Sequence, residues 1–404
     1  MPLDLDAVRA RFPALRDGVA YFDNAGGSLV LASVAERITE YLLTSSVQTG
    51  ATYAASELAA ARLLEARAKI ARLINAARPE EIVLNGSTTI NLRFLATAMA
   101  GRLAPGDEIV VTGFDHESNI GPWRGLAERG VAIRVWELDP LALEPDLDAL
   151  DRLMTDRTRL VAVTHASNIL GSILPIRAIA DLVHARGAEI CVDGVALAPH
   201  RAVDVQALDV DYYAFSFYKT YGPHFAVLYG RHEKLLELDG LYHYFYGREK
   251  VPAKLEPGNT NYELAWGTTA IVDYLDGLGG GTGDHAAIEA AFALIADHEA
   301  VIGGRLLDYL GSRNDVRIIG SRTADPLHRV PTVSFKVDGH DSAAVVRAVD
   351  ADRIGIRYGD FASRRLVESL GLAPRNGVIR ASMVHYNTAE EVDRLIHSLE
   401  RALV

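Results

Sequence analysis

The residue with the clearest chemical potential is a lysine in an aromatic-rich run. Lys219 stands in DYYAFSFYKTYGPHF, where it follows an apolar, strand-like stretch and is flanked by Tyr218 and Tyr221. Aromatic neighbours exclude water, which lowers the pKa of an amine and favours its uncharged form. A lone lysine is usually a solvated surface group, but this setting favours an amine that attacks a carbonyl carbon.

A carboxylate precedes this lysine at the end of another apolar run. Asp193 ends the strand-like stretch in AEICVDGVALAPH, where a charge is costly unless it is paired. A helix cap is the alternative, and metal binding is disfavoured because no ligand cluster of suitable spacing lies nearby. A lysine that forms a Schiff base and an aspartate that keeps a pyridine nitrogen protonated are what pyridoxal 5'-phosphate (PLP) requires. We therefore predict a PLP site and no metal.

Polar turns after three other predicted strands could complete such a site. In NGSTT, Ser87 and Thr88 and the following helix amides could hold a phosphate, although ordinary helix capping gives the same pattern. His116 in FDHESN could stack on a flat ring, and Asn168 in THASNILG could donate to a phenolate or a carboxylate. A surface-loop histidine and a turn asparagine are the alternatives. Ligands collect beyond the carboxyl ends of strands in open α/β sheets, where these turns are expected.

Two arginines near the C-terminus could recognise a carboxylate. Arg380 lies in the strand-like run GVIRASMVHYN, and Arg357 lies in IGIRYGD on a predicted neighbouring strand. Arginine binds a carboxylate through two parallel hydrogen bonds, whereas a structural salt bridge is the alternative. A small amino-acid substrate would supply that carboxylate.

The elements that position these residues read as an α/β protein. Short β-branched runs alternate with helical patterns, which indicates right-handed βαβ units and a mostly parallel sheet. A chain of 404 residues is too long for one ordinary core, and the glycine-rich run DGLGGGTGDH near residue 280 marks a break. We predict an N-terminal arm over 1–18 that packs with the small domain, a large domain over 19–279 and a small α+β domain over 280–404.

The charge and hydropathy of the chain limit the kinds of partner that we expect. The net charge is −12 with both signs interspersed and no basic run, so we expect no nucleic-acid partner. The N-terminus lacks a signal-peptide pattern, and no apolar stretch reaches the roughly 18 residues of a membrane span, which favours a cytoplasmic address. The single cysteine, Cys191, lies in a strand-like run and is expected to be a buried, inert thiol.

Nearly the whole chain resembles the class V aminotransferase family of fold-type I PLP enzymes. The closest resemblance is to the cysteine desulfurase and selenocysteine lyase branch. This resemblance implies a mostly parallel seven-stranded sheet in a large PLP-binding domain, a smaller α+β domain and a homodimer with shared active sites. The motifs that carry it are YFDNAGGS, GSTTINL, DHESN, SNILG, VDG, SFYK, EPGNTN and IRASMVHYNTAEEVDRL.

The resemblance also implies a role for each matching residue. Lys219 would be the Schiff-base lysine, Asp193 would pair with the pyridine nitrogen, and His116 would stack on the ring. Asn168 would lie near the ring oxygen, and Arg380 would bind the α-carboxylate. Asn259 stands where many members have a threonine that reaches the phosphate of the neighbouring subunit, and Asn24 would lie at the site entrance. The phosphate would be held by Ser87, Thr88, Ser216 and Tyr218.

Three departures from the family pattern affect the expected reaction. The run RYGDFAS places Ala362 where desulfurases carry a catalytic cysteine after a motif like RTGHHCA. Ala196 replaces a usual glutamine, and Tyr218 replaces a usual histidine. We therefore predict a C–S lyase that works by β-elimination without a persulfide cysteine. A class V aminotransferase or epimerase and a non-catalytic PLP-binding protein are the alternatives, whereas a PLP-independent enzyme is disfavoured because no G-x-G-x-x-G turn follows a predicted strand.

Overall fold

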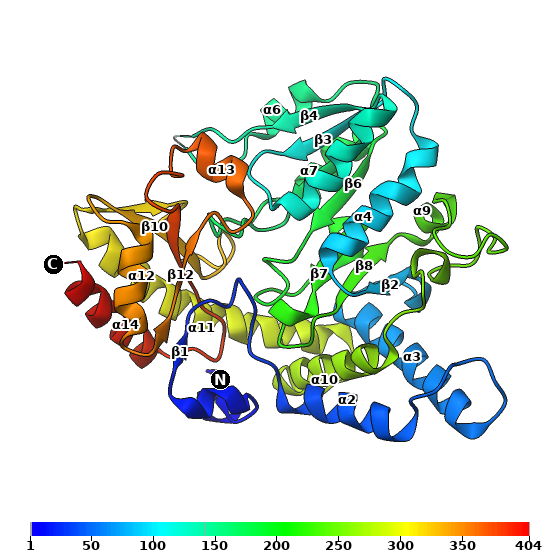
Figure 1. Ribbon diagram of the computed structural model, residues 1–404, viewed down its shortest axis with the longest axis horizontal. Coiled ribbons are helices and arrows are strands. Elements are labelled where there is room, and N and C mark those ends of the chain that lie inside the picture. The colour runs from blue at the N-terminus through cyan, green and yellow to red at the C-terminus, as the bar shows by residue number, and fades with distance from the viewer. Residues whose placement is uncertain (1, 141, 404) are drawn as a thin grey trace.

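The computed structural model describes residues 2–140 and 142–403, and a seven-stranded sheet is its largest element. The strand order is β2-β8-β7-β6-β5-β3-β4, which confirms the predicted α/β class and the mostly parallel sheet (Figure 1). The bounds are β2 (Ile82–Asn85), β3 (Glu108–Thr112), β4 (Ala132–Trp136), β5 (Thr158–Thr164), β6 (Glu189–Asp193), β7 (Tyr212–Ser216) and β8 (Ala226–Gly230).

One strand runs against the others. β8 is antiparallel to both of its neighbours, β7 and β2, so β2 runs in the same direction as β7. The remaining strand pairs are parallel. The turns that follow β2, β3, β5, β6 and β7 therefore all leave the same edge of the sheet.

Helices cover both faces of this sheet, which explains why its strands read as continuous apolar runs. On one face α4 (Thr88–Met99) packs Leu92 and Leu95 against strand residues such as Cys191. On the other face α7 (Ile176–Ala185) packs Ile179 against residues such as Val192. Because successive strand side chains point to opposite faces, Cys191 and Val192 belong to different cores.

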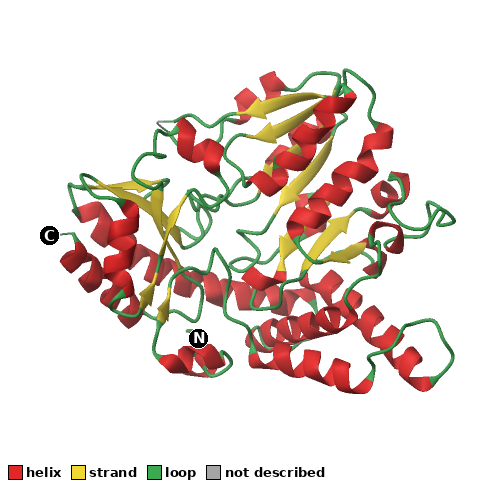
Figure 2. Cartoon of the chain, in the orientation of Figure 1, coloured by secondary structure: helices red, strands yellow, loops and turns green. Residues whose placement is uncertain are grey.

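A second, antiparallel sheet lies beside the first (Figures 1 and 2). Its order is β12-β13-β10-β9, and it packs against α12 (Ser342–Asp350), α14 (Ala389–Ala402) and the second half of α11 (His285–Ser312). Near the N-terminus, β1 (Ala20–Tyr21) pairs in parallel with β11 (Ile354–Gly355), and Phe22 lies in the same core. The strands are β9 (Val316–Ile319), β10 (Thr332–Val337), β12 (Arg357–Gly359) and β13 (Val378–Ser382).

The two cores share one long helix. Ile288 and Ile295, in the first half of α11, pack in the core of the large sheet, whereas Ile302 and Leu306 pack in the core of the small sheet. α10 (Tyr262–Leu278) leads into this helix through Gly279. A Cβ on Gly279 would lie 1.8 Å from the carbonyl oxygen of Ala287, so the turn between the two helices requires glycine.

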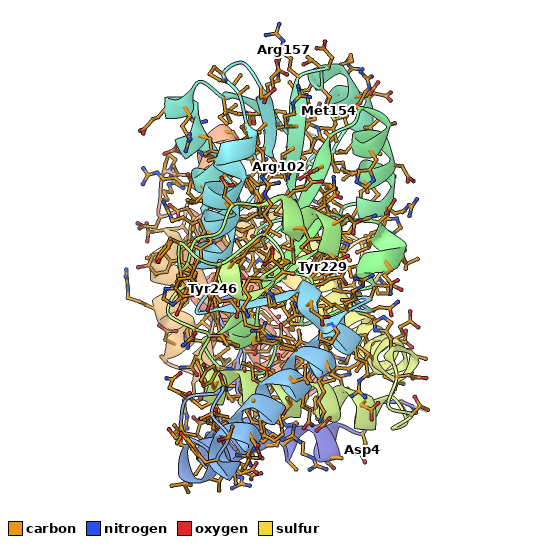
Figure 3. The ribbon with its side chains drawn as sticks, turned by 90° about the vertical axis from the view of Figure 1, so that its right-hand side faces the viewer. Asp4, Arg102, Met154, Arg157, Tyr229 and Tyr246 are labelled. Atoms are coloured by element: carbon orange, nitrogen blue, oxygen red, sulfur yellow. The ribbon has the colours of Figure 1, made fainter. Side chains whose placement is uncertain are left out.

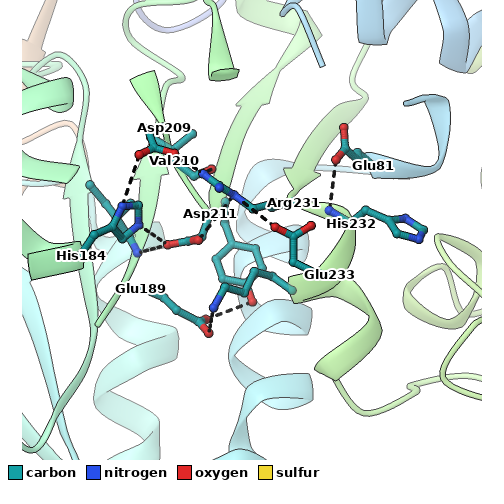
Figure 4. A network of polar contacts seen from close by, with 12 residues as sticks. Glu81, His184, Glu189, Asp209, Val210, Asp211, Arg231, His232 and Glu233 are labelled. Carbon is teal, nitrogen blue, oxygen red and sulfur yellow. Dashed lines mark hydrogen bonds and ion pairs between the residues drawn. The ribbon is translucent and has the colours of Figure 1, made fainter. Parts of the chain in front are cut away.

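A polar network fixes the edge of the large sheet away from the turns described above (Figure 4). Asp211 accepts hydrogen bonds from His184 and from the backbone amide of Ile190, at 2.9 Å each. Asp209 pairs with Arg231 at 2.5 Å. These contacts join the loop before β7 to α7, β6 and the end of β8.

A side view (Figure 3) shows which parts of the chain lie at the two ends of the molecule. Figure 3 shows Asp4, which caps α1 (Leu5–Arg9), at the opposite end of the molecule from Arg157, which precedes β5.

The arm residue Phe12 packs edge-on against Tyr221, with 5.9 Å between the ring centroids, and it also contacts Tyr386, at 4.7 Å. Across 2–140 and 142–403, no helix combines the length and apolar character needed to cross a bilayer.

Candidate active site

The turns at one edge of the large sheet line a cavity that is partly open to solvent. Ser87 follows β2, His116 follows β3 and Asn168 follows β5, while Asp193 ends β6 and Lys219 lies just after β7. The structure therefore brings together residues that the sequence analysis took from separate motifs. The predicted residues that line the cavity are Ser87, Thr88, His116, Asn168, Asp193, Ser216, Tyr218 and Lys219.

Lys219 is buried in the wall of this cavity. Its Nζ lies 5.7 Å from the ring centroid of Tyr218, and that ring stacks on His224 at 4.9 Å. Burial, with the charge of Arg380 as a second cause, lowers the pKa of Lys219 to about 8. At pH 7 about a tenth of the amine is therefore uncharged, far more than for a solvated lysine.

Asp193 is a buried carboxylate that receives one backbone hydrogen bond. The amide of Val195 donates to its Oδ1 at 2.9 Å. Burial raises the pKa of Asp193 to about 6, although this hydrogen bond and the charge of Lys219 oppose the rise. The group is thus mostly ionised at neutral pH, and a cation placed beside it would relieve its desolvation.

His116 presents a neutral imidazole to the cavity. Burial, reinforced by the charge of Lys219, lowers the pKa of His116 to about 4. Its Nδ1 accepts a hydrogen bond from the amide of Ser118 at 3.1 Å, so the ring proton is on Nε2. A neutral aromatic ring in this position can stack on a flat, electron-poor ring.

A second buried carboxylate, Asp115, holds the turn that carries His116. It accepts hydrogen bonds from the backbone amide of His116 at 2.6 Å, from Asn119 at 2.8 Å and from Thr112 at 3.1 Å. Burial and the charge of Asp193 raise the pKa of Asp115. Asp115 is not among the residues predicted from the sequence, although an acid directly before the histidine in FDHESN was an available signal.

Hydroxyl groups and a helix N-terminus gather at one end of the cavity. Ser87 caps α4 by accepting a hydrogen bond from the amide of Ile90 at 3.2 Å, and the hydroxyls of Thr88 and Ser216 lie 2.7 Å apart. A Cβ on Gly86 would meet only Ile90, at 3.8 Å, so the turn is open. The capping role and an anion site are compatible, because the helix amides favour negative charge.

These groups fit PLP. Hydroxyls and helix amides suit its phosphate, the Asp193 carboxylate suits a protonated pyridine nitrogen, and the amine of Lys219 suits its aldehyde. His116 adds a ring that can stack. The fit rests on the kinds of donor and acceptor that line one cavity, at the sheet edge where α/β proteins bind ligands.

A wider cavity opens beside the first, and two arginines line it. Arg380, on β13, is buried, and it donates to Asp23 at 3.2 Å and to the carbonyl of Asn168 at 3.1 Å. Arg357, on β12, is exposed and pairs with the same Asp23 at 3.3 Å. Burial lowers the pKa of Arg380 to about 10, which leaves it a cation at neutral pH. The salt-bridge alternative is thus present, with both arginines sharing one carboxylate that the sequence analysis did not single out.

Two of the predicted site residues, Asn24 and Asn259, line neither cavity. Asn24 is buried behind the entrance, where its amide donates to the carbonyl of Ser382 at 2.9 Å and to Asn387 at 3.1 Å. Its neighbours Ala25 and Gly26 line the wider cavity instead. Asn259 lies on an exposed loop with φ of 66°, where it accepts a hydrogen bond from Tyr242 at 3.4 Å.

The structure also places the three departures from the family pattern. Ala362 lines the wider cavity, and Ala196 and Tyr218 line the inner one. Cys191 is fully buried in β6, and burial raises the pKa of its thiol. No sulfur nucleophile therefore stands at position 362, and the cysteine that the chain does have lies in the core.

Comparisons with known proteins match this site and fold. The chain is 45% identical to the aminotransferase-like protein FGM3 of Gibberella zeae, over 99% of this chain and 98% of that protein. It is 35% identical to a cysteine desulfurase of Dickeya dadantii, over 98% and 96%. The apo structure of a cysteine desulfurase from Thermococcus onnurineus superposes with a TM-score of 0.89 at 28% identity, over 100% and 98%.

The family model described as aminotransferase class-V matches residues 20–395, which include every strand of the large sheet and the strands that carry both arginines. That span also holds the cavity whose donors and acceptors suit PLP. The chain therefore belongs to the class V aminotransferase family and is a PLP-dependent enzyme of the cysteine desulfurase-like kind.

Proposed function

We propose that this enzyme is a C–S lyase that cleaves a sulfur substituent from Cβ of an amino acid or amino-acid derivative by β-elimination. The observation that carries the proposal is the loop beside Arg380, which presents Ala362 to the cavity. The thiol of Cys191 is buried in the sheet and is not a cavity-lining group. Transfer of sulfur to the protein at this loop therefore has no acceptor, whereas elimination needs none.

The residues divide the work between recognition and proton transfer. Arg380 binds the substrate carboxylate, and Arg357 lies at the entrance. The carboxylate contact fixes the orientation of Cα and so determines which of its bonds is cleaved. Lys219 takes the proton from Cα, for which a pKa of about 8 suits a base that works near neutral pH. The leaving thiolate then departs from Cβ with the electron pair of the C–S bond.

The remaining residues hold the cofactor. Bound PLP supplies an electron sink for the negative charge that develops at Cα. Asp193 would keep a proton on the pyridine nitrogen, and His116 would stack on the ring. Asn168 lines both cavities, so it could contact both the ring and the substrate. The phosphate is held by Ser87, Thr88, Ser216 and Tyr218.

Product analysis tests the reaction type. Purified holoenzyme is incubated with cysteine and S-substituted cysteines and no keto acid, and we expect a thiol or sulfide, ammonia and pyruvate in equal amounts. No persulfide should form on the wild-type protein. Ala362→Cys, which places a thiol at this position, is the matched variant for comparison. Amino-group transfer that depends on an added keto acid, or racemisation without thiol release, would replace the lyase proposal with the aminotransferase or epimerase alternative. No turnover of any amino acid would favour the non-catalytic alternative.

We also propose a homodimer with shared sites. Asn259 is exposed and lines neither cavity of its own chain, which supports a role at the site of a second copy. Light scattering should give twice the 43.8 kDa mass of the chain. Asn259→Ala should keep that mass and weaken PLP retention by about tenfold, the effect of losing one hydrogen bond to a charged group. A monomer mass, or unchanged PLP retention, would contradict this proposal.

A further inference from the structure

We propose that Phe361 and Ser363 are positioning residues that orient Arg380 and Asn168 for the substrate carboxylate. They lie in the loop over 360–363, between β12 and α13 (Arg364–Ser369). The inference rests on the proposed function, because it takes Arg380 as the carboxylate-binding group. It assigns a task to the loop that carries a cysteine in the desulfurases that this chain resembles.

Phe361 fixes the plane of the arginine. The guanidinium carbon of Arg380 lies 3.7 Å from the ring centroid of Phe361, so the two flat groups are in contact. Nη1 and Nη2 are held by Asn168 and Asp23, whereas Nε is buried and has no hydrogen-bond partner among the described residues. A guanidinium whose plane is fixed by an aromatic ring and by hydrogen bonds at both Nη atoms is preorganised to meet a carboxylate that enters from the cavity.

Ser363 fixes the amide of Asn168. The hydroxyl of Ser363 donates to Oδ1 at 2.8 Å, and Nδ2 donates to the carbonyl of Phe361 at 3.0 Å. The backbone carbonyl of Asn168 in turn accepts from Arg380. The loop contacts Asn168 through Ser363 and Phe361, Asn168 contacts Arg380, and Arg380 contacts Phe361. A shift of the loop would therefore disturb both Asn168 and Arg380.

The backbone of the loop is strained, which indicates that its contacts are strong enough to hold it. Phe361 and Ala362 have φ of 51° and 56°, in the left-handed region that favours glycine. The carbonyl of Ala362 accepts from the amide of Glu117 at 2.8 Å, and Glu117 pairs with Arg365 at 3.1 Å. Since Glu117 directly follows His116, the same loop is tied to the turn that carries the stacking imidazole.

The test compares Phe361→Leu, which removes the aromatic face, with Phe361→Tyr, which retains it. Holoenzyme is titrated with cysteine and with cysteamine, its counterpart without the carboxylate, and the visible absorbance of the bound cofactor is followed. We expect Phe361→Leu to weaken cysteine binding by about tenfold and leave cysteamine binding unchanged. Phe361→Tyr should stay near the wild type, and in turnover KM should change more than kcat. Ser363→Ala should act in the same direction.

Three results would overturn the proposal: equal weakening of cysteine and cysteamine, no weakening of either, or the same loss in Phe361→Tyr as in Phe361→Leu. The titration is read by stopped flow in the phase before any bond at Cβ is cleaved, so it is independent of the reaction type. If products show that no lyase reaction occurs while the titration gives the expected split, the role of the loop stands and the lyase proposal fails.

Discussion

Replacing Lys219 by alanine is expected to remove the visible absorbance of lysine-bound PLP and to lower turnover by about a hundredfold to ten-thousandfold, the range for loss of a general base. The reason is that one buried amine serves both as the covalent attachment point and as the base at Cα. Absorbance spectra of the purified protein and rates with added PLP measure the two effects. In the wild type, borohydride reduction followed by peptide mass analysis should place the pyridoxyl group on Lys219.

Lys250 offers a matched control for this variant. Its Nζ lies 5.8 Å from the ring of Tyr246, much as Lys219 lies beside Tyr218, but Lys250 is exposed on a loop. Lys250→Ala should therefore keep both the absorbance and the rate. If Lys219→Ala retained the absorbance, or if the pyridoxyl group were recovered on another lysine, the assignment of Lys219 would be lost.

Asp193→Asn is expected to keep PLP on Lys219 but to lower kcat by about a hundredfold to a thousandfold, as when a preorganised electrostatic group is removed from an active site. The amide has nearly the shape of the carboxylate and can still accept from Val195, but it carries no charge to hold a proton on the pyridine nitrogen. Steady-state kinetics together with absorbance spectra measure the change.

Asp211→Asn is the control for this second variant. Asp211 is also a buried carboxylate between β6 and β7, but it lies in the polar network away from the cavity (Figure 4). We expect it to lower thermal stability and to leave kcat close to the wild-type value. A kcat within about threefold of the wild type for Asp193→Asn, well below the effect of removing such a group, would remove Asp193 from the proposed mechanism.

The positions of Lys219, Asp193 and His116 could be predicted together because they obey a simple rule of topology. Each follows an apolar run in a βαβ pattern, and parallel strands bring their carboxyl ends to one edge. The direction of β8 could not be predicted in the same way. Its five residues are all buried and have no periodicity that distinguishes a parallel from an antiparallel strand, so tertiary packing decides its direction.

The contacts of Arg380 show a different limit. The contact between Arg380 and Phe361 and the shared carboxylate of Asp23 join residues from distant parts of the chain, and residue types alone do not reveal such pairs. Asn24 was expected at the entrance because of the motif around it, but its amide has several partners inside the protein and so points inward. Sequence position located the motif, whereas hydrogen-bond satisfaction decided which of its residues face the cavity.

The two residues that would contact the substrate, Lys219 and Arg380, come from parts of the chain with different hydrophobic cores. Lys219 follows β7 of the large sheet, Arg380 lies on β13 of the small sheet, and α11 packs in both cores. An amino acid with its carboxylate on Arg380 and its Cα beside Lys219 would therefore act as a noncovalent cross-link between the two cores. Since a ligand that binds only the folded protein stabilises it by mass action, such a cross-link would also make the two cores melt as one cooperative unit.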